Sequence, residues 1–438
     1  MTDRRWVVAT LLLLGCGGGD APPPPADATM RAPSPAADAP VRALTHARLW
    51  TGTDAPLAED GTVLIQGGRV AAAGPSSTVR VPADAEVTDL GGLWVVPGFI
   101  NSHGHVGDVL GLEGGHYTEE NLLRQLRLYA WYGVTTVVSL GGDAEEGVAL
   151  RNGQDTPELD RSRLFVAGPV VEAETPDAAR EVVAQLDHMD VDWVKIRVDD
   201  NLGTTRKMEP DVYTAVIDEA HARGLKVAAH IFYLEDARAL LQAGADFIAH
   251  SVRDRTVDAR FIEALSLSGA CYSPTLMREV STFIYESTPE FFADSFFLAQ
   301  ADTAVLRRLS DPARQAEVRA NPAAQRYKQA LETARLNLVV IAGAGLPVAL
   351  GTDTGPAGRF QGYFEHREME LMSAAGMSPA AVLLAATRTA ARCMGLPEVG
   401  TLEPGKWADL VVLEADPFQD IANTRRIHSV WIAGHRVR

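Results

Sequence analysis

The sequence predicts an α/β fold, a (β/α)8 or TIM barrel, with a small β-sandwich domain formed by the N- and C-terminal segments. Through the middle of the chain, apolar strand candidates alternate with amphipathic helix candidates, which is the repeat of a parallel barrel. Strand-like segments with glycine turns lie towards both ends. His103 and Asp353, at the first and last barrel strands, are 250 residues apart, close to the ~250 residues of a complete barrel.

Eight apolar segments are the barrel-strand candidates, and helical patterns such as DAAREVVAQLDHM and DVYTAVIDEAHARG separate them. We expect the barrel to span residues 97–397. An open, doubly wound sheet is the structural alternative, but ionisable residues at the strand ends favour a closed barrel. The candidates are LWVVPGFI, TTVVSLG, RLFVAG, WVKIRV, KVAAHI, DFIAHS, ACYSPTL and PVALGTD.

The two ends of the folded part have a different pattern. TVLIQGGRVAAAG predicts a hairpin, and ADLVVLEADP and IHSVWIAGHRV near the C-terminus are again strand-like. We expect residues 42–96 and 398–438 to pair into the β-sandwich.

Composition excludes several classes of protein. With 438 residues, 46% of them hydrophobic, the chain can bury a large core, and its net charge of −17 opposes binding to nucleic acid. Three cysteines are too few for a disulfide framework or a thiolate zinc site. We expect Cys271 and Cys393 to be buried free thiols.

The beginning of the chain predicts export. Two arginines precede the apolar residues 6–14, and LLGC then ends at Cys16, which resembles the lipobox of bacterial lipoproteins. We expect residues 1–16 to be a signal peptide, residues 17–41 a disordered Pro/Ala-rich linker, and Cys16 to anchor the protein by lipid on the periplasmic or cell-surface side of a membrane. A hydrophobic N-terminus that ends in LLGC by chance is the alternative.

Two histidines end the first strand candidate. His103 and His105 lie in PGFINSHGH, where alternation turns both side chains to the barrel mouth and Gly104 leaves the backbone room to turn. The spacing alone is weak evidence. However, neutral imidazoles at this position suit Zn²⁺.

Lys195 lies inside the strand candidate WVKIRV, where alternation places it and Arg197 toward the barrel interior. A buried ammonium is costly, so it requires either an ion pair with Asp or Glu or a chemical role. A lysine with a depressed pKa can react with CO₂ to form a carbamate, which can bridge two metals.

Three further strand candidates end in His230, His250 and Asp353. Each histidine taken alone is more simply a hydrogen-bonded core residue. Four histidines, one lysine and one aspartate at the same barrel edge instead predict a metal site.

The order HxH, Lys, His, His, Asp resembles the binuclear amidohydrolases, in the imidazolonepropionase and prolidase-like branch. VVPGFINSHGH, GLKVAAHIF, ALLQAGADFIAHS, VALGTDTG and VGTLEPGKWADLVVLEADP support the resemblance, which covers about residues 45–437. It implies hydrolysis of an amide bond, of the peptide or N-acyl amino acid type, by a hydroxide that bridges two divalent metal ions, expected to be Zn²⁺.

The resemblance also implies a role for each ligand. His103, His105 and Asp353 would hold one metal ion. His230 and His250 would hold the other, and carbamylated Lys195 would bridge both. Asp353 would also act as general base and then general acid.

The chain departs from the pattern after two strands. Deaminases of the superfamily have a glutamate where this chain has Tyr233, which argues against deamination. Many relatives have Glu-His-Gly after strand six, whereas this chain has AHSVRD, which places Arg253 above the predicted metals. Arg253 is a candidate to hold a substrate carboxylate, as in a carboxypeptidase-like or dipeptidase-like enzyme, and a salt bridge to Asp254 or Asp258 is the alternative. Further substrate-binding candidates are Arg197, Tyr233 and Tyr272.

The segment at about 278–321 is an insertion rich in aromatic residues. It could form a lid over the substrate, or its rings could simply pack the insertion on the barrel.

The expected partner is a small-molecule substrate, and we expect no binding to nucleic acid. Contact with a membrane is expected only through lipidated Cys16, and the sequence is compatible with a homo-oligomer. Two other functions stay open. The same metal centre suits an ester, a lactone or a phosphotriester, and a non-catalytic lipoprotein on an amidohydrolase barrel is the third hypothesis.

Overall fold

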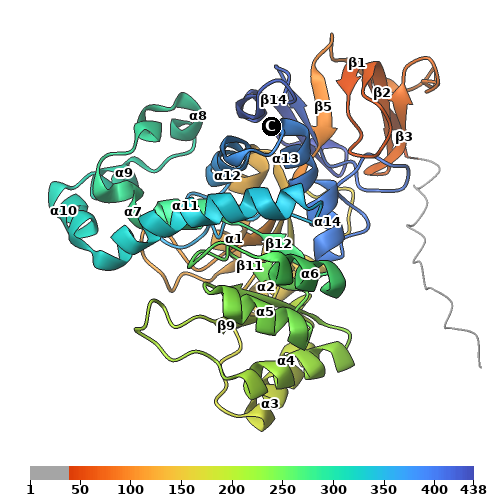
Figure 1. Ribbon diagram of the computed structural model, residues 1–438. Helices are drawn as coiled ribbons and strands as arrows, with labels where there is room; N and C mark the ends of the chain where they lie inside the picture. The colour runs from red at the N-terminus through yellow and green to blue at the C-terminus, as the bar shows by residue number, and fades with distance from the viewer. Residues whose placement is uncertain (1–38) are drawn as a thin grey trace, which may run out of the picture. The chain divides into compact units, whose positions relative to one another are not determined.

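The computed structural model describes residues 39–438 (Figure 1). The predicted signal peptide, Cys16 and nearly all of the predicted linker therefore lie outside the described residues. Within residues 39–438, none of the helices combines the length and the apolarity needed to cross a bilayer.

The predicted barrel is confirmed. Its parallel strands form two hydrogen-bonded groups, in the orders β6-β7-β8 and β12-β11-β10-β9. Residues 348–354 form the eighth parallel segment of the barrel, between β12 and β6. The strands are β6 (Phe99–Gly104), β7 (Val134–Ser139), β8 (Arg163–Val166), β9 (Trp193–Val198), β10 (Lys226–Ile231), β11 (Phe247–Ala249) and β12 (Cys271–Ser273).

Main-chain hydrogen bonds close the ring. Ala349 N donates to Tyr272 O over 2.9 Å, and Ser102 N donates to Leu350 O over 2.8 Å, so the eighth segment joins β12 to β6. β8 and β9 are joined by hydrogen bonds from Asp192 N to Val166 O and from Val171 N to Lys195 O, both 2.8 Å.

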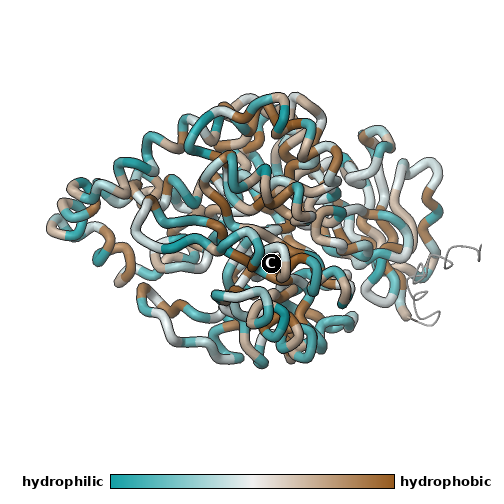
Figure 2. The backbone as a smooth tube through the Cα atoms, turned by 60° about the horizontal axis from the view of Figure 1, so that its bottom comes forward, coloured by the Kyte–Doolittle hydropathy of each residue, from teal (hydrophilic) through white to brown (hydrophobic). Residues whose placement is uncertain are grey.

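Helices cover the outside of the barrel because one face of each is apolar. Buried residues of these helices and of the strands share one large hydrophobic cluster, and hydrophobic and hydrophilic residues alternate along the outer segments (Figure 2). Caps fix several helix ends: Thr175 accepts a hydrogen bond from Ala178 N at the start of α3, and Gly244 (φ 101°) ends α5. The helices are α1 (Glu119–Trp131), α2 (Glu145–Asn152), α3 (Pro176–His188), α4 (Pro210–Ala222), α5 (Leu234–Ala243), α6 (Ala259–Ser268), α11 (Pro322–Gly343), α12 (Tyr363–Ala375), α13 (Pro379–Ala385), α14 (Arg388–Met394) and the 3₁₀ helix η3 (Ile421–Arg425).

The two ends of the described chain form one sheet in the order β15-β14-β13-β5-β1-β2-β3, with β4 paired to β1. Figure 1 shows the orange N-terminal strands beside the blue strand β14. Strands from both ends share a small apolar core of their own, as predicted for the β-sandwich domain. The strands are β1 (Val41–Leu49), β2 (Ala58–Gln66), β3 (Arg69–Pro75), β4 (Glu86–Asp89), β5 (Trp94–Pro97), β13 (Leu410–Leu413), β14 (Ile427–Ile432) and β15 (His435–Arg436).

One predicted strand is divided between the two domains. LWVVPGFI was expected to be a single barrel strand, but β5 pairs with β1 and β13, and only β6 enters the barrel. Pro97 and Gly98 lie at the break, where proline has no N–H for a continued ladder.

The aromatic residues of the insertion pack on the barrel. Phe291 and Phe297 share a cluster with Tyr363 and Phe364 of α12, and the ring centroids of Phe297 and Tyr363 are 4.8 Å apart. This is the packing alternative considered for the insertion. Its elements are α7 (Leu276–Phe283), η1 (Ile284–Glu286), η2 (Glu290–Ala293), α8 (Ser295–Leu298), α9 (Thr303–Leu309) and α10 (Pro312–Ala320).

The expectation of free thiols is wrong. Cys271 at the start of β12 and Cys393 in α14 form a disulfide across 122 residues of chain. Sequence spacing could not predict the pairing, because the two residues meet only after the barrel closes.

Candidate metal centre and active site

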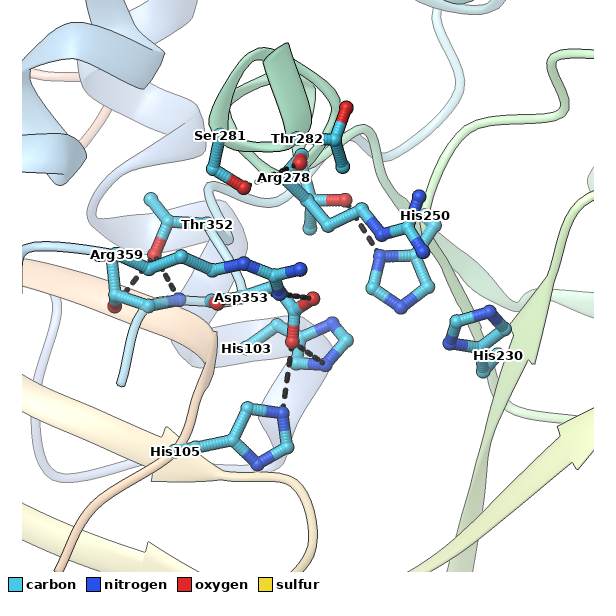
Figure 3. Close-up of polar contacts among 12 residues, drawn as sticks. His103, His105, His230, His250, Arg278, Ser281, Thr282, Thr352, Asp353 and Arg359 are labelled. Atoms are coloured by element: carbon cyan, nitrogen blue, oxygen red, sulfur yellow. Dashed lines mark hydrogen bonds and ion pairs between the residues drawn. The ribbon is translucent and has the colours of Figure 1, made fainter. Parts of the chain in front are cut away.

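Figure 3 shows five of the six predicted ligands, the four histidines and Asp353, gathered at the C-terminal ends of the barrel strands. The His103 and His250 ring centroids are 4.7 Å apart, and those of His230 and His250 are 4.2 Å apart. Lys195 Nζ lies 3.2 Å from His103 Nε2. On the other side, His105 Nε2 lies 2.8 Å from Asp353 Oδ1. The sequence prediction required this convergence.

The backbone is strained at two of these residues. His250 (φ 75°) and Asp353 (φ 59°) both adopt left-handed conformations that non-glycine residues rarely take. His250 directly follows β11, and Asp353 lies near the end of the eighth barrel segment, so each turn aims the side chain across the barrel mouth. Gly355 (φ 115°) allows the next turn, since a Cβ there would lie 2.1 Å from His105 O.

Burial disfavours the charged forms of His103, His230, His250 and Lys195. It lowers the pKa of His230 to about 3 and holds the pKa values of His103 and His250 well below the ordinary histidine value. Burial also lowers the pKa of Lys195 to about 7, although Asp353 opposes the shift. Neutral imidazoles and an amine that loses its proton near neutral pH are the forms that bind metal or react with CO₂.

Asp353 is the anion of the cluster. Burial opposes its ionisation, but Arg359 and His105 outweigh burial and hold the pKa of this carboxyl well below its usual range. An ion pair joins Arg359 Nη1 to Asp353 Oδ2. The site therefore presents one permanent carboxylate to a cation.

Neighbouring groups orient the ring nitrogens. His105 Nδ1 lies 2.9 Å from Gly141 O, and because a carbonyl oxygen only accepts, Nδ1 carries a proton. In the neutral ring, Nε2 then has a lone pair that faces Asp353 Oδ1. Two acceptors at 2.8 Å need a cation or a proton between them. On the other side of the cluster, His250 Nδ1 contacts Thr275 Oγ1 at 2.8 Å.

The residues fit a metal site. Ligand atoms of His103, His250 and Asp353 all lie within 4.8 Å of one another. His103 Nδ1 is buried without a hydrogen-bond partner among residues 39–438, although buried polar atoms are rarely left unpaired. Imidazole and carboxylate donors without thiolate suit a divalent ion such as zinc.

The amidohydrolase family model matches residues 94–437. The chain belongs to the amidohydrolase family. It is 30% identical over 210 residues to an uncharacterised protein of Mycobacterium bovis, an alignment that covers 45% of this chain and only 54% of that relative. It is 28% identical over 419 residues to an imidazolonepropionase of Streptomyces griseus, covering 89% of this chain and 95% of the other.

Among solved structures, a putative prolidase from Bifidobacterium longum is 27% identical, with a TM-score of 0.72 over 91% of this chain and 94% of the other. The predicted family is thus confirmed, with relatives in the predicted branch. Membership in it supports a hydrolase that uses divalent metal.

One buried carboxylate of this amidohydrolase escaped prediction. Asp199 Oδ2 lies 2.8 Å from His230 Nε2, and the Asp199 side chain is fully buried. Burial opposes its charge, but the hydrogen bond from His230 lowers the pKa of this carboxyl overall. Its spacing from Lys195 was a usable signal, because residues 195, 197 and 199 share one face of an extended strand.

The candidate substrate residues have different surroundings. Arg197, expected inside the barrel, has a side chain that is 44% exposed and lies 3.8 Å from Asp199, because the strand ends here and the barrel opens to solvent. Tyr233 donates a hydrogen bond to Asp200 over 2.9 Å. Tyr272 is fully buried and accepts a hydrogen bond from Val252 N, so it supports the loop after β11.

Arg253 is buried and does not pair with Asp254 or Asp258, the two partners considered from the sequence. It forms an ion pair with Glu279 (3.0 Å). Arg253 Nη1 donates to Ile231 O and Ser251 O at 2.8 and 2.7 Å. Glu279 follows β12, and sequence alone could not show that the loops after β11 and β12 meet.

Two other arginines lie at the cluster without having been predicted, Arg278 and Arg359 (Figure 3). Both stand in loops or short helices after barrel strands, the positions at which barrel enzymes place functional residues. That rule was the only available signal for either.

Proposed function

We propose that this amidohydrolase is a metal-dependent hydrolase that cleaves an amide bond, of the peptide or N-acyl amino acid type. The convergence of His103, His105, Lys195, His230, His250 and Asp353 on one barrel edge is the observation that carries the proposal. The chain is similar to an imidazolonepropionase and to a putative prolidase, and both names denote enzymes that cleave a carbon–nitrogen bond. This likeness supports cleavage of an amide over cleavage of an ester.

The residues that would hold metal fall into two groups. His103, His105 and Asp353 would bind one divalent ion. His230 and His250 would bind a second, and a carbamate on Lys195 would bridge the two. When bound, zinc lowers the pKa of a coordinated water to about 7 and polarises the substrate carbonyl.

Asp353 would move the proton. Its low pKa keeps it ionised at neutral pH, and Arg359 fixes one of its oxygens. In hydrolysis, the water oxygen bonds to the carbonyl carbon, the carbon–nitrogen bond breaks, and the proton of the water goes through Asp353 to the leaving amine. No serine or cysteine nucleophile is required.

A substrate panel tests the proposal. Zinc-loaded protein is assayed with N-acyl amino acids, Xaa-Pro dipeptides, aryl esters and lactones, with Asp353→Asn as the inactive control. We expect amide turnover that falls about 100-fold or more in Asp353→Asn. Esterase activity without amide turnover would overturn amide cleavage, and turnover of none of the compounds would favour a non-catalytic lipoprotein.

We also propose export and lipid anchoring through Cys16. The disulfide between Cys271 and Cys393 supports export, because disulfides persist in oxidising compartments. Labelling with a radioactive fatty acid in a bacterial host tests the anchor. Label should enter the wild type and not Cys16→Ser, and equal labelling of both would contradict the anchor.

A further inference from the structure

Two arginines share a single buried carboxylate beside the metal centre. Arg253, Arg278 and Glu279 are 1%, 7% and 0% exposed. Glu279 Oε1 lies 3.0 Å from Arg253 Nε and 3.1 Å from Arg278 Nη1. This group of three carries a net positive charge in a place where charges are costly unless they are paired.

The two arginines are used differently. Arg253 has a structural task, because its Nη1 binds the carbonyls of Ile231 and Ser251 and its guanidinium lies over the Phe232 ring, 4.7 Å from the centroid. Within residues 39–438, the Arg278 side chain makes no such contacts with backbone carbonyls. Its Nη1 contacts Glu279, and its buried Nε, like Nε and Nη2 of Arg253, has no hydrogen-bond partner in the described part of the chain. The two carbonyl contacts of Arg253 are therefore what separates the two side chains.

The surroundings hold Arg278 in place. It lies in the first turn of α7, where Glu368 accepts hydrogen bonds from Leu276 N and Met277 N at 2.8 and 2.6 Å. Its guanidinium lies over the Tyr327 ring, 4.4 Å from the centroid. Both contacts pre-organise the arginine, so little side-chain entropy remains to be lost when it binds a ligand.

Arg278 also faces the reaction site. Figure 3 shows its side chain running from α7 toward the His250 imidazole, while Arg359 reaches Asp353 from the other side of the cluster. The charges interact as well, since Asp353 favours the charged form of Arg278 and Arg278 disfavours protonation of His230. An anion at Arg278 would therefore lie next to the metal ligands.

We propose that Arg278 binds a carboxylate of the substrate, so that the enzyme acts on anionic amides. The planar guanidinium matches a carboxylate, and the unpaired Nε together with the excess positive charge provides what such a ligand needs. The assignment rests on the proposed amide hydrolysis. The sequence suggested Arg253 as the residue that binds the carboxylate, and the structure favours Arg278 instead.

Paired compounds test the assignment. N-acetyl-L-leucine and N-butylsuccinamic acid carry a carboxylate on the amine side and on the acyl side of the amide. N-acetyl-3-methylbutylamine and N-butylpropanamide are the same amides without it. The variants are Arg278→Gln, Arg278→Lys and the control Arg326→Gln, which changes an exposed arginine of α11.

We expect the wild type to prefer at least one acid over its neutral partner. Arg278→Gln should lower kcat/KM for that acid by about 50-fold or more and leave the neutral amide nearly unchanged. Arg278→Lys should lose less of its kcat/KM for the acid, since lysine keeps the positive charge but cannot donate two parallel hydrogen bonds to a carboxylate. Arg326→Gln should have the kcat/KM values of the wild type. Equal losses on acid and neutral amide, or no preference in the wild type, would overturn the assignment.

Calorimetric binding of the same four compounds separates this inference from the proposed function. If the wild type binds an acid without cleaving it, and Arg278→Gln loses that binding while keeping its metal content, amide hydrolysis fails and the carboxylate site stands. Equal binding of an acid by both proteins, or binding of neither acid by the wild type, overturns the site itself.

Discussion

Lys195 Nζ lies 3.2 Å from His103 Nε2, and both side chains are buried in the mouth of the barrel. Burial disfavours the charged ammonium and lowers the pKa of Lys195 to about 7. The uncharged amine is the form that reacts with CO₂, and the product is an anion among four histidines. A carbamate at this position would need a cation in the cluster to balance its charge.

Replacing Lys195 should therefore reduce metal binding. After loading with zinc and bicarbonate, we expect about two zinc ions per wild-type chain and clearly fewer in Lys195→Ala, with turnover falling about 100-fold or more. Elemental analysis measures the metal. Lys226→Ala changes an exposed lysine of the neighbouring strand and should behave like the wild type. Unchanged zinc content in Lys195→Ala would exclude a bridging role.

The disulfide should contribute to stability. Cys271 and Cys393 close a loop of 122 residues, and constraining a loop of this size stabilises a folded chain by about 2–5 kcal/mol. We expect Cys271→Ala/Cys393→Ala to lower the free energy of urea unfolding by that amount. Dithiothreitol should destabilise the wild type and leave the double variant unaffected. No effect of reductant on the wild type would mean that the thiols are free in solution.

Much of the fold, and the meeting of the candidate ligands at one edge of the barrel, could be predicted from the sequence because both depend on local patterns. The period-two alternation that turns Lys195 inward belongs to its strand alone, and His103, His105, His230 and Asp353 lie at strand ends that any parallel barrel brings together. Each residue could therefore be placed without knowing its neighbours.

Contacts between distant loops could not be predicted in this way. The pairing of Arg253 with Glu279 joins the loops after β11 and β12, and the disulfide joins β12 to α14. Asp254 and Asp258 are no less plausible partners for a buried arginine until the loops are placed. Arg278 was overlooked for the same reason, since only its position above His250 gives it meaning.

A buried glutamate, Glu365, holds together the backbone that carries the candidate metal ligands. Glu365 Oε1 accepts hydrogen bonds from Asn101 Nδ2, Thr352 Oγ1 and Thr354 Oγ1 at 2.6, 2.8 and 2.7 Å, which ties β6 to the turn that carries Asp353. Glu365→Ala would leave three buried donors without this acceptor. We expect it to lose about 2–4 kcal/mol of unfolding free energy and about 10- to 100-fold in zinc affinity. Glu365→Gln keeps one acceptor oxygen, so its losses of unfolding free energy and of zinc affinity should be smaller. Zinc affinity equal to that of the wild type in Glu365→Ala would show that the support is not needed.

Glu368 should make stability depend on pH. Burial raises the pKa of this carboxyl from 4.5 to about 8, although hydrogen bonds from Met277 N and Leu276 N oppose the shift. Between these values the folded chain holds a proton that the unfolded chain releases, so Glu368 lowers stability as pH rises from about 4.5 to about 8, by at most about 5 kcal/mol. Urea unfolding of metal-free wild type and Glu368→Gln at pH 5 and pH 8 measures the effect. The glutamine variant cannot titrate at this position, so its stability relative to the wild type should rise by a few kcal/mol between the two pH values. If the difference between the two proteins is the same at both pH values, Glu368 is already ionised in the folded protein and its two backbone hydrogen bonds outweigh its burial.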